Sequence, residues 1–337
     1  MTFPPKASHR LIARDRSASV SLDIIIPVYN EEEIVDLIVE RLRSVFSPEA
    51  CAAEGLKRVR YLFVDDGSRD RSAQMLMGHI QAGFPAQLIR LSRNFGHQCA
   101  VTAGLDYADA DVVAVIDADL QDPPEILYGM LSRWRDGADV VYGERRKRKE
   151  HLVKRAAYWG FYRLLAVLSE IAIPLDSGDF CLMDRCVVEQ MRQLPEKLRF
   201  IRGLRSWVGF HQEGFPYERH GRAAGEPKYT WGRLYNLATN GIASMSIRPL
   251  KLLQLITFVF FVFSSVIAIM LLLVLTGGSH WDVPASVLGL YLLGTFSAAV
   301  QAFSVYLLGA YIGRTYQEVK GRPAYVVMEV VEAPPLE

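Results

Sequence analysis

The chain has 337 residues, a formal net charge of +1 and a hydrophobic fraction of 50%. The near-neutral charge excludes a nucleic-acid-binding protein that works through an overall basic surface, and the charged fraction of 22% excludes a chain embedded entirely in a membrane. The length predicts about two domains. Most of the hydrophobic excess lies after residue 250, so we expect a soluble domain attached to a membrane segment.

The N-terminal part alternates short apolar runs with amphipathic stretches. Residues 1–20 lack the apolar core of a signal peptide, so we expect them to be a basic leader. From Leu22 to about Gly143 the predicted strands are SLDIIIPV, VRYLFVDD, QLIRLS, DVVAVID and ADVVYG. Helices are predicted between them, with start signals at Asn30 and its three following glutamates, Ser68, His97 and Asp122. The alternation predicts an α/β fold with a mostly parallel sheet and helices on both faces.

The C-terminal part has the features of a membrane anchor. Residues 145–170 begin with a basic cluster and continue as an apolar helix, and residues 231–251 are amphipathic, so both are predicted to lie at a membrane interface. The uncharged runs Leu252–Leu275 and Val283–Ile312 are long enough to cross about 30 Å of hydrocarbon. Basic residues flank the pair but are absent from its connector, which predicts a two-helix transmembrane hairpin (252–312) with both termini cytoplasmic.

The cytoplasmic tail, residues 313–337, contains the β-branched stretch RPAYVVMEVVE. This stretch predicts a strand, which could extend the sheet of a neighbouring subunit. The cysteines show neither C-x-x-C spacing nor nearby histidine partners, so we expect reduced thiols and neither a zinc site nor a disulfide framework.

Carboxylates and other polar residues follow three of the predicted strands. Asp117 and Asp119 end one strand, Asp65 and Asp66 end another, and the segment 27–31 ends the first. The carboxyl ends of strands in such folds form the ligand-binding edge. Two adjacent carboxylates repel each other unless a cation lies between them, and hard oxygen ligands favour Mg²⁺ or Mn²⁺ with a substrate diphosphate completing the coordination. The sequence therefore predicts a metal and diphosphate site at this edge.

Four sequence blocks resemble the signatures of the family 2 glycosyltransferases, which have the Rossmann-like GT-A fold. They are DIIIPVYNEEE (23–33), VDDGSRDRS (64–72), RNFGHQCAVTAGLDYA (93–108) and DADLQDPPE (117–125). Three later blocks are similar to those of the polyprenyl-phosphate glycosyltransferases, a group that includes dolichol-phosphate mannosyltransferases and bacterial two-span relatives: SGDFCLMDR (177–185), IRGL (201–204) and RAAGEPKY (222–229). The resemblance covers roughly residues 20–325 and implies that residues 21–230 form a cytoplasmic GT-A catalytic domain.

The resemblance also implies the residues of the site. Those that would bind the nucleotide sugar are Pro27, Tyr29, Glu31, Asp66, Asp117, Ala118 and Gln121. The metal ligands would be Asp117, Asp119 and Gln121, and the catalytic residues would be Asp119, Asp179 and Arg145. The phosphates and the acceptor would contact Arg145, Arg202, Arg222 and Lys228. Two positions depart from the family pattern: Pro227 stands where Ser or Thr is usual, and His97 where Lys is common.

The implied function is that of an inverting, metal-dependent hexosyltransferase. It would move a sugar from a UDP- or GDP-linked donor to undecaprenyl or dolichyl phosphate at the cytoplasmic face of a bacterial or archaeal membrane, as a homo-oligomer with a tetramer among the options. A polyprenyl phosphate is already an anion, so it can attack the sugar without a strong general base. Two alternatives stay open: a transferase acting on another lipid such as diacylglycerol, and a catalytically silent membrane adaptor of the same fold. The basic cluster at 145–155 could bind the lipid phosphate or only membrane headgroups.

Overall fold

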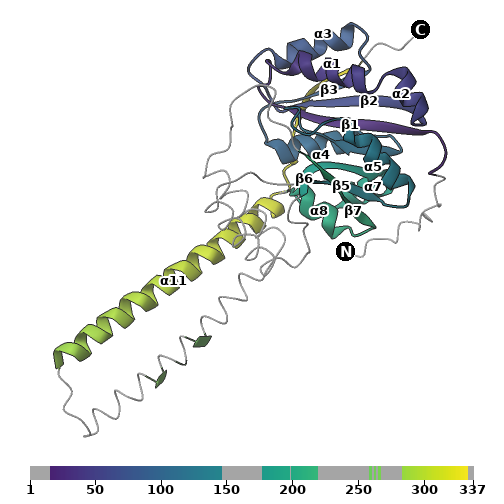
Figure 1. Cartoon of the computed structure of the whole chain (residues 1–337). Coiled ribbons are helices and arrows are strands. Elements are labelled where there is room, and N and C mark those ends of the chain that lie inside the picture. Colours follow the sequence, from purple (N-terminus) through teal and green to yellow (C-terminus); the bar gives the residue numbers. More distant parts are fainter. Residues whose placement is uncertain are drawn as a thin grey trace, which may run out of the picture.

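The computed structural model describes residues 16–145, 177–197, 199–218, 258–259, 262, 265–266 and 283–332. Its strands are β1 (Val20–Val28), β2 (Leu56–Asp65), β3 (Ala86–Leu91), β4 (Val112–Val115), β5 (Val140–Arg145), β6 (Ser177–Asp184), β7 (Gln212–Tyr217) and β8 (Val327–Glu332). Its helices are α1 (Val35–Val45), α2 (Pro48–Ala53), α3 (Ser72–Gln81), α4 (His97–Tyr107), α5 (Ile126–Arg135), α7 (Arg185–Gln193), α8 (Ile201–Trp207) and α11 (Val283–Val319). Figure 1 shows an α/β domain from which α11 projects.

The eight strands form one sheet in the order β7-β5-β6-β4-β1-β2-β3-β8. The centre, β4-β1-β2-β3, is parallel as predicted. However, β6 runs antiparallel to both β4 and β5, and β8 runs antiparallel to β3. Strand β5 therefore points the same way as the centre, and β7 is parallel to β5. Six of the eight described strands share one direction, in line with the prediction of a mostly parallel sheet, and the sheet is mixed because β6 and β8 run against them. A strand that is buried on both faces is a continuous apolar run in either direction, so its sequence carries no signal for its polarity.

Helices cover both faces of the sheet, which confirms that part of the prediction. Helices α1, α3 and α5 pack on one face, and α4, α7 and α8 pack on the other. Within β1, Ile24 and Ile26 belong to the first cluster, whereas Ile25 belongs to the second. Because alternate side chains of a strand point to opposite faces, β1 is buried on both sides and its ends are the part left to bind ligands.

Helix α1 begins at Val35, later than the prediction that placed Asn30 as its cap. Asn30 has a φ of 52°, in the left-handed region. Its side-chain Oδ1 accepts a hydrogen bond from the Arg69 N–H at 2.8 Å, and its own N–H donates to Ser68 Oγ at 3.0 Å. The polar segment after β1 is therefore a loop tied to the loop after β2, which brings the ends of these two neighbouring strands together.

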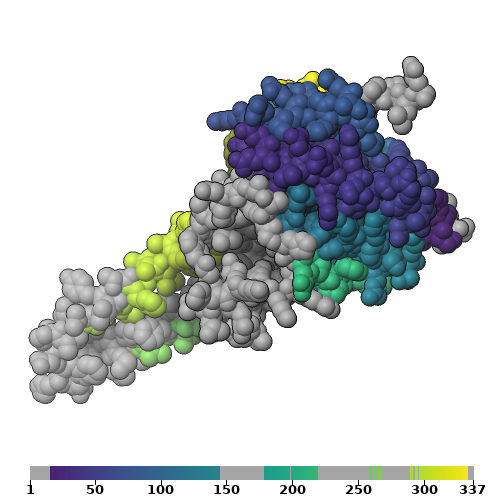
Figure 2. All heavy atoms as spheres, turned by 45° about the horizontal axis from the view of Figure 1, so that its top comes forward, coloured from purple at the N-terminus to yellow at the C-terminus, as the bar shows by residue number. Residues whose placement is uncertain are grey.

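One stretch among the described residues, Phe296–Val319 in α11, is long and apolar enough to cross a membrane. Its mean hydropathy is 1.4 and none of it is buried. Helix α11 has 37 residues and is therefore about 55 Å long, more than one crossing of the hydrocarbon needs. The space-filling view shows its described part extending away from the α/β domain (Figure 2). The predicted second span is thus a long helix, which continues through Arg314 to Val319.

Several predicted segments fall outside the described residues. Of the predicted first span, Leu252–Leu275, only 258–259, 262 and 265–266 are described, and these are helical. The leader up to residue 15 lies outside the described part of the chain. So do the predicted interfacial helices at 145–170 and 231–251, apart from Arg145, which ends β5.

The tail forms the predicted strand, β8. That strand pairs with β3 of the same chain, whereas the sequence analysis considered pairing with the sheet of a neighbouring subunit. The connection from α11 is anchored at two points. The Lys197 N–H donates to the two carboxylate oxygens of Glu318 at 3.0 and 2.9 Å, and the Tyr325 hydroxyl donates to Asp106 Oδ2 at 2.6 Å. The tail therefore covers the edge of its own sheet, which removes an exposed edge strand at β3.

Candidate active site at the strand ends

The loop after β4 carries the acidic motif. Asp117 follows the strand, and Leu120 has a φ of 54°, a conformation that side-chain-bearing residues rarely adopt. The Gln121 N–H donates to Asp119 Oδ1 at 3.2 Å, which closes a short turn within the motif. Unfavourable backbone of this kind persists where the surrounding structure holds it, and it concentrates at ligand sites.

The antiparallel pairing of β4 with β6 places Asp179 beside Asp117. Val115 pairs with Cys181, so continuing both strands by two residues brings the two aspartates level with each other. His97, the first residue of α4, lies against both: its Nε2 is 3.2 Å from Asp179 Oδ2 and 3.9 Å from Asp117 Oδ1. Residues from three separate parts of the sequence therefore form one cluster.

Asp179 is a buried carboxylate whose oxygens are both engaged. Arg202 Nε donates to Oδ1 at 2.8 Å, and Gln98 Nε2 donates to Oδ2 at 3.0 Å. The Gln98 side chain also accepts from the Ile201 N–H at 2.8 Å, which fixes the start of α8 against α4. Burial works to raise the pKa of Asp179, but the charges and hydrogen bonds of Arg202 and His97 hold it well below its usual range.

The side chains that act on the charge of Asp117 include more carboxylates than cations. Burial raises the pKa of Asp117, and Asp122, Asp179 and Asp119 raise it further, while His97 opposes the rise. Burial lowers the pKa of His97, but the hydrogen bond to Asp179 and the charges of Asp117 and Asp179 outweigh it and raise that pKa to about 9. His97 is therefore an imidazolium at neutral pH, and the cluster can still accept a further cation.

Within residues 16–145 and the other described ranges, no group of three or more His, Cys, Asp and Glu side chains is placed to hold a metal ion by itself. Asp117, Asp119 and Gln121 nevertheless offer two carboxylates and an amide oxygen. Oxygen ligands of this kind suit Mg²⁺ or Mn²⁺ when substrate phosphates supply the remaining ligands. The excess negative charge also fits a cation that arrives together with a diphosphate.

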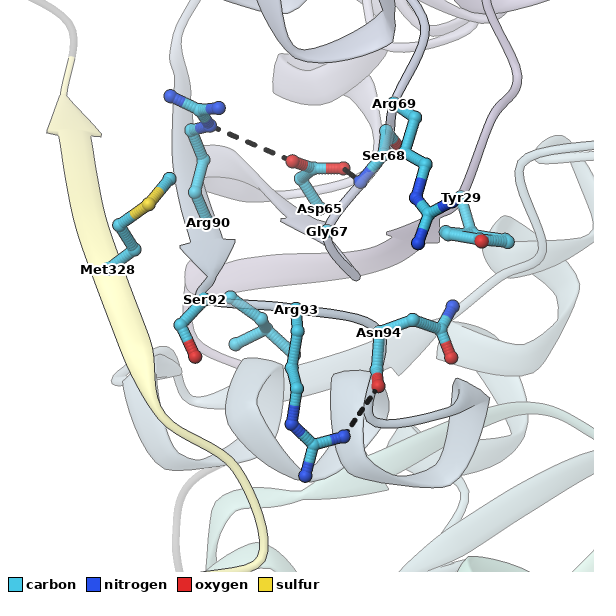
Figure 3. A pocket seen from close by; sticks show the side chains of 11 residues that line it. Tyr29, Asp65, Gly67, Ser68, Arg69, Arg90, Ser92, Arg93, Asn94 and Met328 are labelled. Atoms are coloured by element: carbon cyan, nitrogen blue, oxygen red, sulfur yellow. Dashed lines mark hydrogen bonds and ion pairs between the residues drawn. The ribbon is translucent and has the colours of Figure 1, made fainter.

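A cavity of about 280 Å³ lies at the other end of the same edge, at the ends of β1, β2 and β3 (Figure 3). Its wall combines one aromatic ring, three guanidinium groups and small polar groups, namely Tyr29, Arg69, Arg90, Arg93, Ser68 and Asn94. An aromatic face with hydrogen-bond donors and cations around it suits a flat, polar ring and the phosphates attached to it.

The loop after β2 and the loop after β3 approach each other closely at this cavity. Gly67 has a φ of 69°, and a Cβ atom added there would lie 2.5 Å from the backbone carbonyl carbon of Arg93. Asp66 accepts from the N–H groups of Phe95 and Gly96 at 2.7 and 2.9 Å. Burial raises the pKa of Asp66, and these two donors oppose the rise. Both oxygens of Asp66 therefore hold the loop before α4, which makes Asp66 a support of the cavity.

The structure divides the expected site residues into three sets. Those at the acidic end of the strand edge are Asp117, Ala118, Asp119, Gln121, Asp179 and Arg202. Those at or beside the cavity are Pro27 in β1, Tyr29 in its wall, Asp66 behind it, and Glu31, whose N–H donates to Ser72 Oγ at 2.9 Å. The third set consists of basic residues whose side chains are not described. Arg145 is described only as the last residue of β5, and Arg222 and Lys228 lie outside the described residues.

Several residues of these sites had no assigned role in the sequence analysis, among them His97, Gln98, Met328 and the arginines of the cavity wall. The sequence analysis named His97 as the start of a helix and as a departure from a family pattern, and its place directly after the RNFG block was a usable signal for a role in the site. Gln98 follows it and had no signal of its own. Met328 lines the cavity from β8, and no local pattern could show this because the tail reaches the cavity only through tertiary packing.

Comparison with known proteins shows the family of the chain. Residues 23–192 match the family described as Glycosyl transferase family 2. The uncharacterized glycosyltransferase YkcC of Bacillus subtilis is 41% identical over 318 residues, which cover 93% of this chain and 95% of that protein. A prophage bactoprenol glucosyl transferase homolog of Escherichia coli is 33% identical over 318 residues, covering 92% and 99% of the two chains. The bactoprenol glucosyl transferase of Shigella phage SfII is 34% identical over 315 residues, covering 91% and 97%.

Among solved structures, the mannosyl-3-phosphoglycerate synthase from Rubrobacter xylanophilus is similar with a TM-score of 0.46 and 17% sequence identity. The similarity covers 66% of this chain and 72% of that one.

Proposed function

The chain belongs to glycosyl transferase family 2, and on that premise we propose that it transfers a sugar, with inversion, from a nucleotide donor to a polyprenyl phosphate at the cytoplasmic face of a membrane. In the proposed reaction an oxygen of the lipid phosphate attacks the anomeric carbon, the bond from that carbon to the diphosphate breaks, and a nucleoside diphosphate leaves. Relatives named bactoprenol glucosyl transferases, which match over more than nine-tenths of the chain, support this class of acceptor.

The two ends of the strand edge suit the two parts of the donor. The nucleoside would enter the cavity, with its base against Tyr29 and with Arg69 and Arg93 near its polar groups. The diphosphate would extend toward Asp117 and Asp119, where a divalent cation held by these carboxylates and Gln121 would neutralise the charge of the leaving diphosphate. Ala118, buried between the two aspartates, would let the donor approach the backbone of this loop.

The engagement of Asp179 is the observation that carries the choice of acceptor. A hydroxyl acceptor, such as that of diacylglycerol, would need a general base within reach. Both oxygens of Asp179 already accept hydrogen bonds: Oδ1 from Arg202, and Oδ2 from Arg202 and Gln98, with His97 Nε2 also 3.2 Å from Oδ2. A phosphate acceptor carries its own negative charge and needs no base, and the cations Arg202 and His97 would draw it to this end of the site.

The remaining parts of the proposal concern the membrane. Helix α11 and the uncharged run Leu252–Leu275 would form a hairpin with both ends cytoplasmic. Arg145, with the basic residues that follow it, and the later bases Arg222 and Lys228 would meet the lipid phosphate at the membrane surface. A homo-oligomer remains part of this proposal, because the large exposed apolar surface of α11 can contact other helices as well as lipid.

Transfer into the lipid phase tests the proposal. The purified full chain in liposomes that contain undecaprenyl phosphate would be given Mg²⁺ or Mn²⁺ and a panel of labelled UDP- and GDP-sugars. We expect a labelled glycolipid from one donor, no label with Asp119→Ala, and unchanged label with the control Asp36→Ala, which alters an exposed aspartate on α1.

The alternatives predict other results in the same assay. Transfer to diacylglycerol but not to the polyprenyl phosphate would overturn the proposed acceptor. Transfer that survives Asp119→Ala would overturn the proposed metal site. Nucleotide binding without transfer from any donor would favour the silent adaptor.

A further inference from the structure

Strand β8 contains a bulge where it passes the cavity. Arg90 pairs with Glu329, but the next residue, Leu91, pairs with Val327, so Met328 is an extra residue on the tail side of the ladder. The pairing resumes beyond it, where the Ser92 N–H donates to the carbonyl oxygen of Val326 at 2.9 Å. Bulges of this kind redirect a side chain, and they are frequent beside active sites.

The packing of β8 shows the effect of this bulge. In a regular strand, residues four positions apart share a face. Val327 and Val331 instead pack against opposite faces of the sheet, one with the α4 cluster and the other with the α1 cluster. The extra residue therefore shifts the alternation by one position. Met328 is the residue released by the shift, and its side chain is 56% exposed although the strand around it is docked.

Met328 is released into the wall of the cavity. Figure 3 shows Met328 and Tyr29 at opposite ends of the cavity, with Arg90 and Arg93 between them. Methionine is flexible and polarizable, and its sulfur makes favourable contacts with aromatic rings. A nucleoside base that enters between these two side chains would find an apolar contact on the β8 side and an aromatic one on the β1 side.

Arg90 connects this part of β8 to the loops of the cavity. Its Nη1 donates to Glu329 Oε2 at 2.8 Å, and its Nε lies 3.7 Å from Asp65 Oδ2. The other oxygen of Asp65 accepts from the Ser68 N–H at 2.9 Å. A chain of polar contacts therefore runs from the tail strand to the loop after β2, which holds Met328 at a fixed place in the wall.

We propose that β8 is part of the donor site, and that Met328 contacts the base of the bound nucleotide and helps to set which base fits. This inference rests on the proposed function, because it takes the cavity as the nucleoside site. It adds a consequence for the membrane segment. Helix α11 leads directly into this tail, and the contacts of Glu318 and Tyr325 fix the tail to the α/β domain, so the chain that anchors the protein also completes its donor pocket.

Nucleotide affinity tests this inference. Calorimetric titration of the full chain in detergent with UDP and with GDP, in the presence of Mn²⁺, would compare wild type, Met328→Ala and the control Val330→Ala. Val330 is a partly exposed residue of the same strand that does not line the cavity. For the nucleotide that wild type prefers, we expect Met328→Ala to weaken binding about fivefold through lost apolar contact, and Val330→Ala to leave it unchanged.

A second variant separates a role in recognition from a role in folding. Met328→Trp narrows the cavity, so it should weaken the binding of GDP, which has the larger base, more than that of UDP. Equal affinities of wild type and Met328→Ala, with an unchanged ratio of GDP to UDP affinity in Met328→Trp, would overturn the inference while leaving the proposed transfer reaction intact. Failure of wild type to bind either nucleotide would overturn the donor site itself, and the inference with it.

Discussion

The two ends of the strand edge are built in different ways. At the end formed by β4 and β6, charged side chains define the site: Asp117 and Asp179 flank the imidazolium of His97, and negative charge is in excess. At the end formed by β1, β2 and β3, backbone segments define the cavity, because the loop at Gly67 touches the backbone at Arg93. The charge of the first end favours the binding of a cation, and the shape of the second end favours the binding of a flat ring.

This difference teaches which kind of change each end should tolerate. A substitution that keeps the size of a side chain but removes its charge should impair the acidic end and leave its shape intact. A single added methyl group should damage the cavity end even though no charge changes. Four predictions, from the largest expected effect to the smallest, test this contrast.

The largest effect is expected for Asp117→Asn. Loss of one carboxylate from the proposed metal and diphosphate site should lower the rate of sugar transfer by about 10³-fold. Because burial and neighbouring carboxylates oppose ionisation of Asp117, the same change should not lower the free energy of unfolding. Transfer assays in liposomes and thermal unfolding would measure the two quantities, with Asp36→Asn as the control. Unchanged transfer, or a loss of activity that follows a loss of stability, would contradict this account.

Arg202→Ala should have the next largest effect, this time on stability. It leaves the buried Asp179 without its strongest cation, at a cost of about 3 kcal/mol in the free energy of unfolding. The matched control is Arg41→Ala, which breaks an exposed ion pair with Glu125 and should cost about 0.5 kcal/mol or less. Urea unfolding of the full chain in detergent would compare the two variants, and equal losses would show that the Asp179 cluster is not a closely coupled unit.

Gly67→Ala tests the cavity end. The added methyl group meets the backbone at Arg93 and also forces a side chain into a left-handed conformation, so we expect a loss of about 2 kcal/mol in stability together with weaker nucleotide binding. Gly83→Ala separates the two causes, since Gly83 has a φ of 86° but nothing lies within 4 Å of the added carbon. That control should cost about 1 kcal/mol and leave nucleotide binding unchanged. Normal binding in Gly67→Ala would show that the cavity does not depend on this backbone approach.

The smallest effect is a dependence of stability on pH that arises from His97. Its pKa is about 9 in the folded protein and about 6.5 in an unfolded chain, so its contribution is complete below pH 6.5 and is lost as the pH rises through about 9. Because the side chain is 39% exposed, screening reduces this contribution to about 1 kcal/mol. Urea unfolding of the metal-free chain between pH 6 and 10 should show wild type and His97→Gln converging at high pH. A constant difference between the two curves would contradict the assignment.

Much of the fold could be predicted because its signals are local. The strand around Ile25, the strand that ends at Asp65, and the helix that begins at His97 all lie where the alternation of apolar runs placed them. The start of α1 could not be predicted, because Asn30 satisfies the hydrogen-bonding groups of another loop instead of capping the helix. The sequence could name the acidic motif and Tyr29 as candidates for the site, since both follow the ends of predicted strands. The partners of Asp179 could not be predicted from spacing, because they come from two helices that are distant in sequence.

The sequence by itself determined the alternation that builds the central parallel strands, the carboxylates at their ends and the apolar length of α11. These properties follow from the order of residue types along short stretches, which fixes local conformation and burial. Only the tertiary structure decided that β6 runs antiparallel and brings Asp179 to Asp117, and that the tail turns back so that β8 places Met328 in the cavity. Pairing between distant strands depends on the free energy of the whole packed sheet, and no short stretch of sequence contains that information.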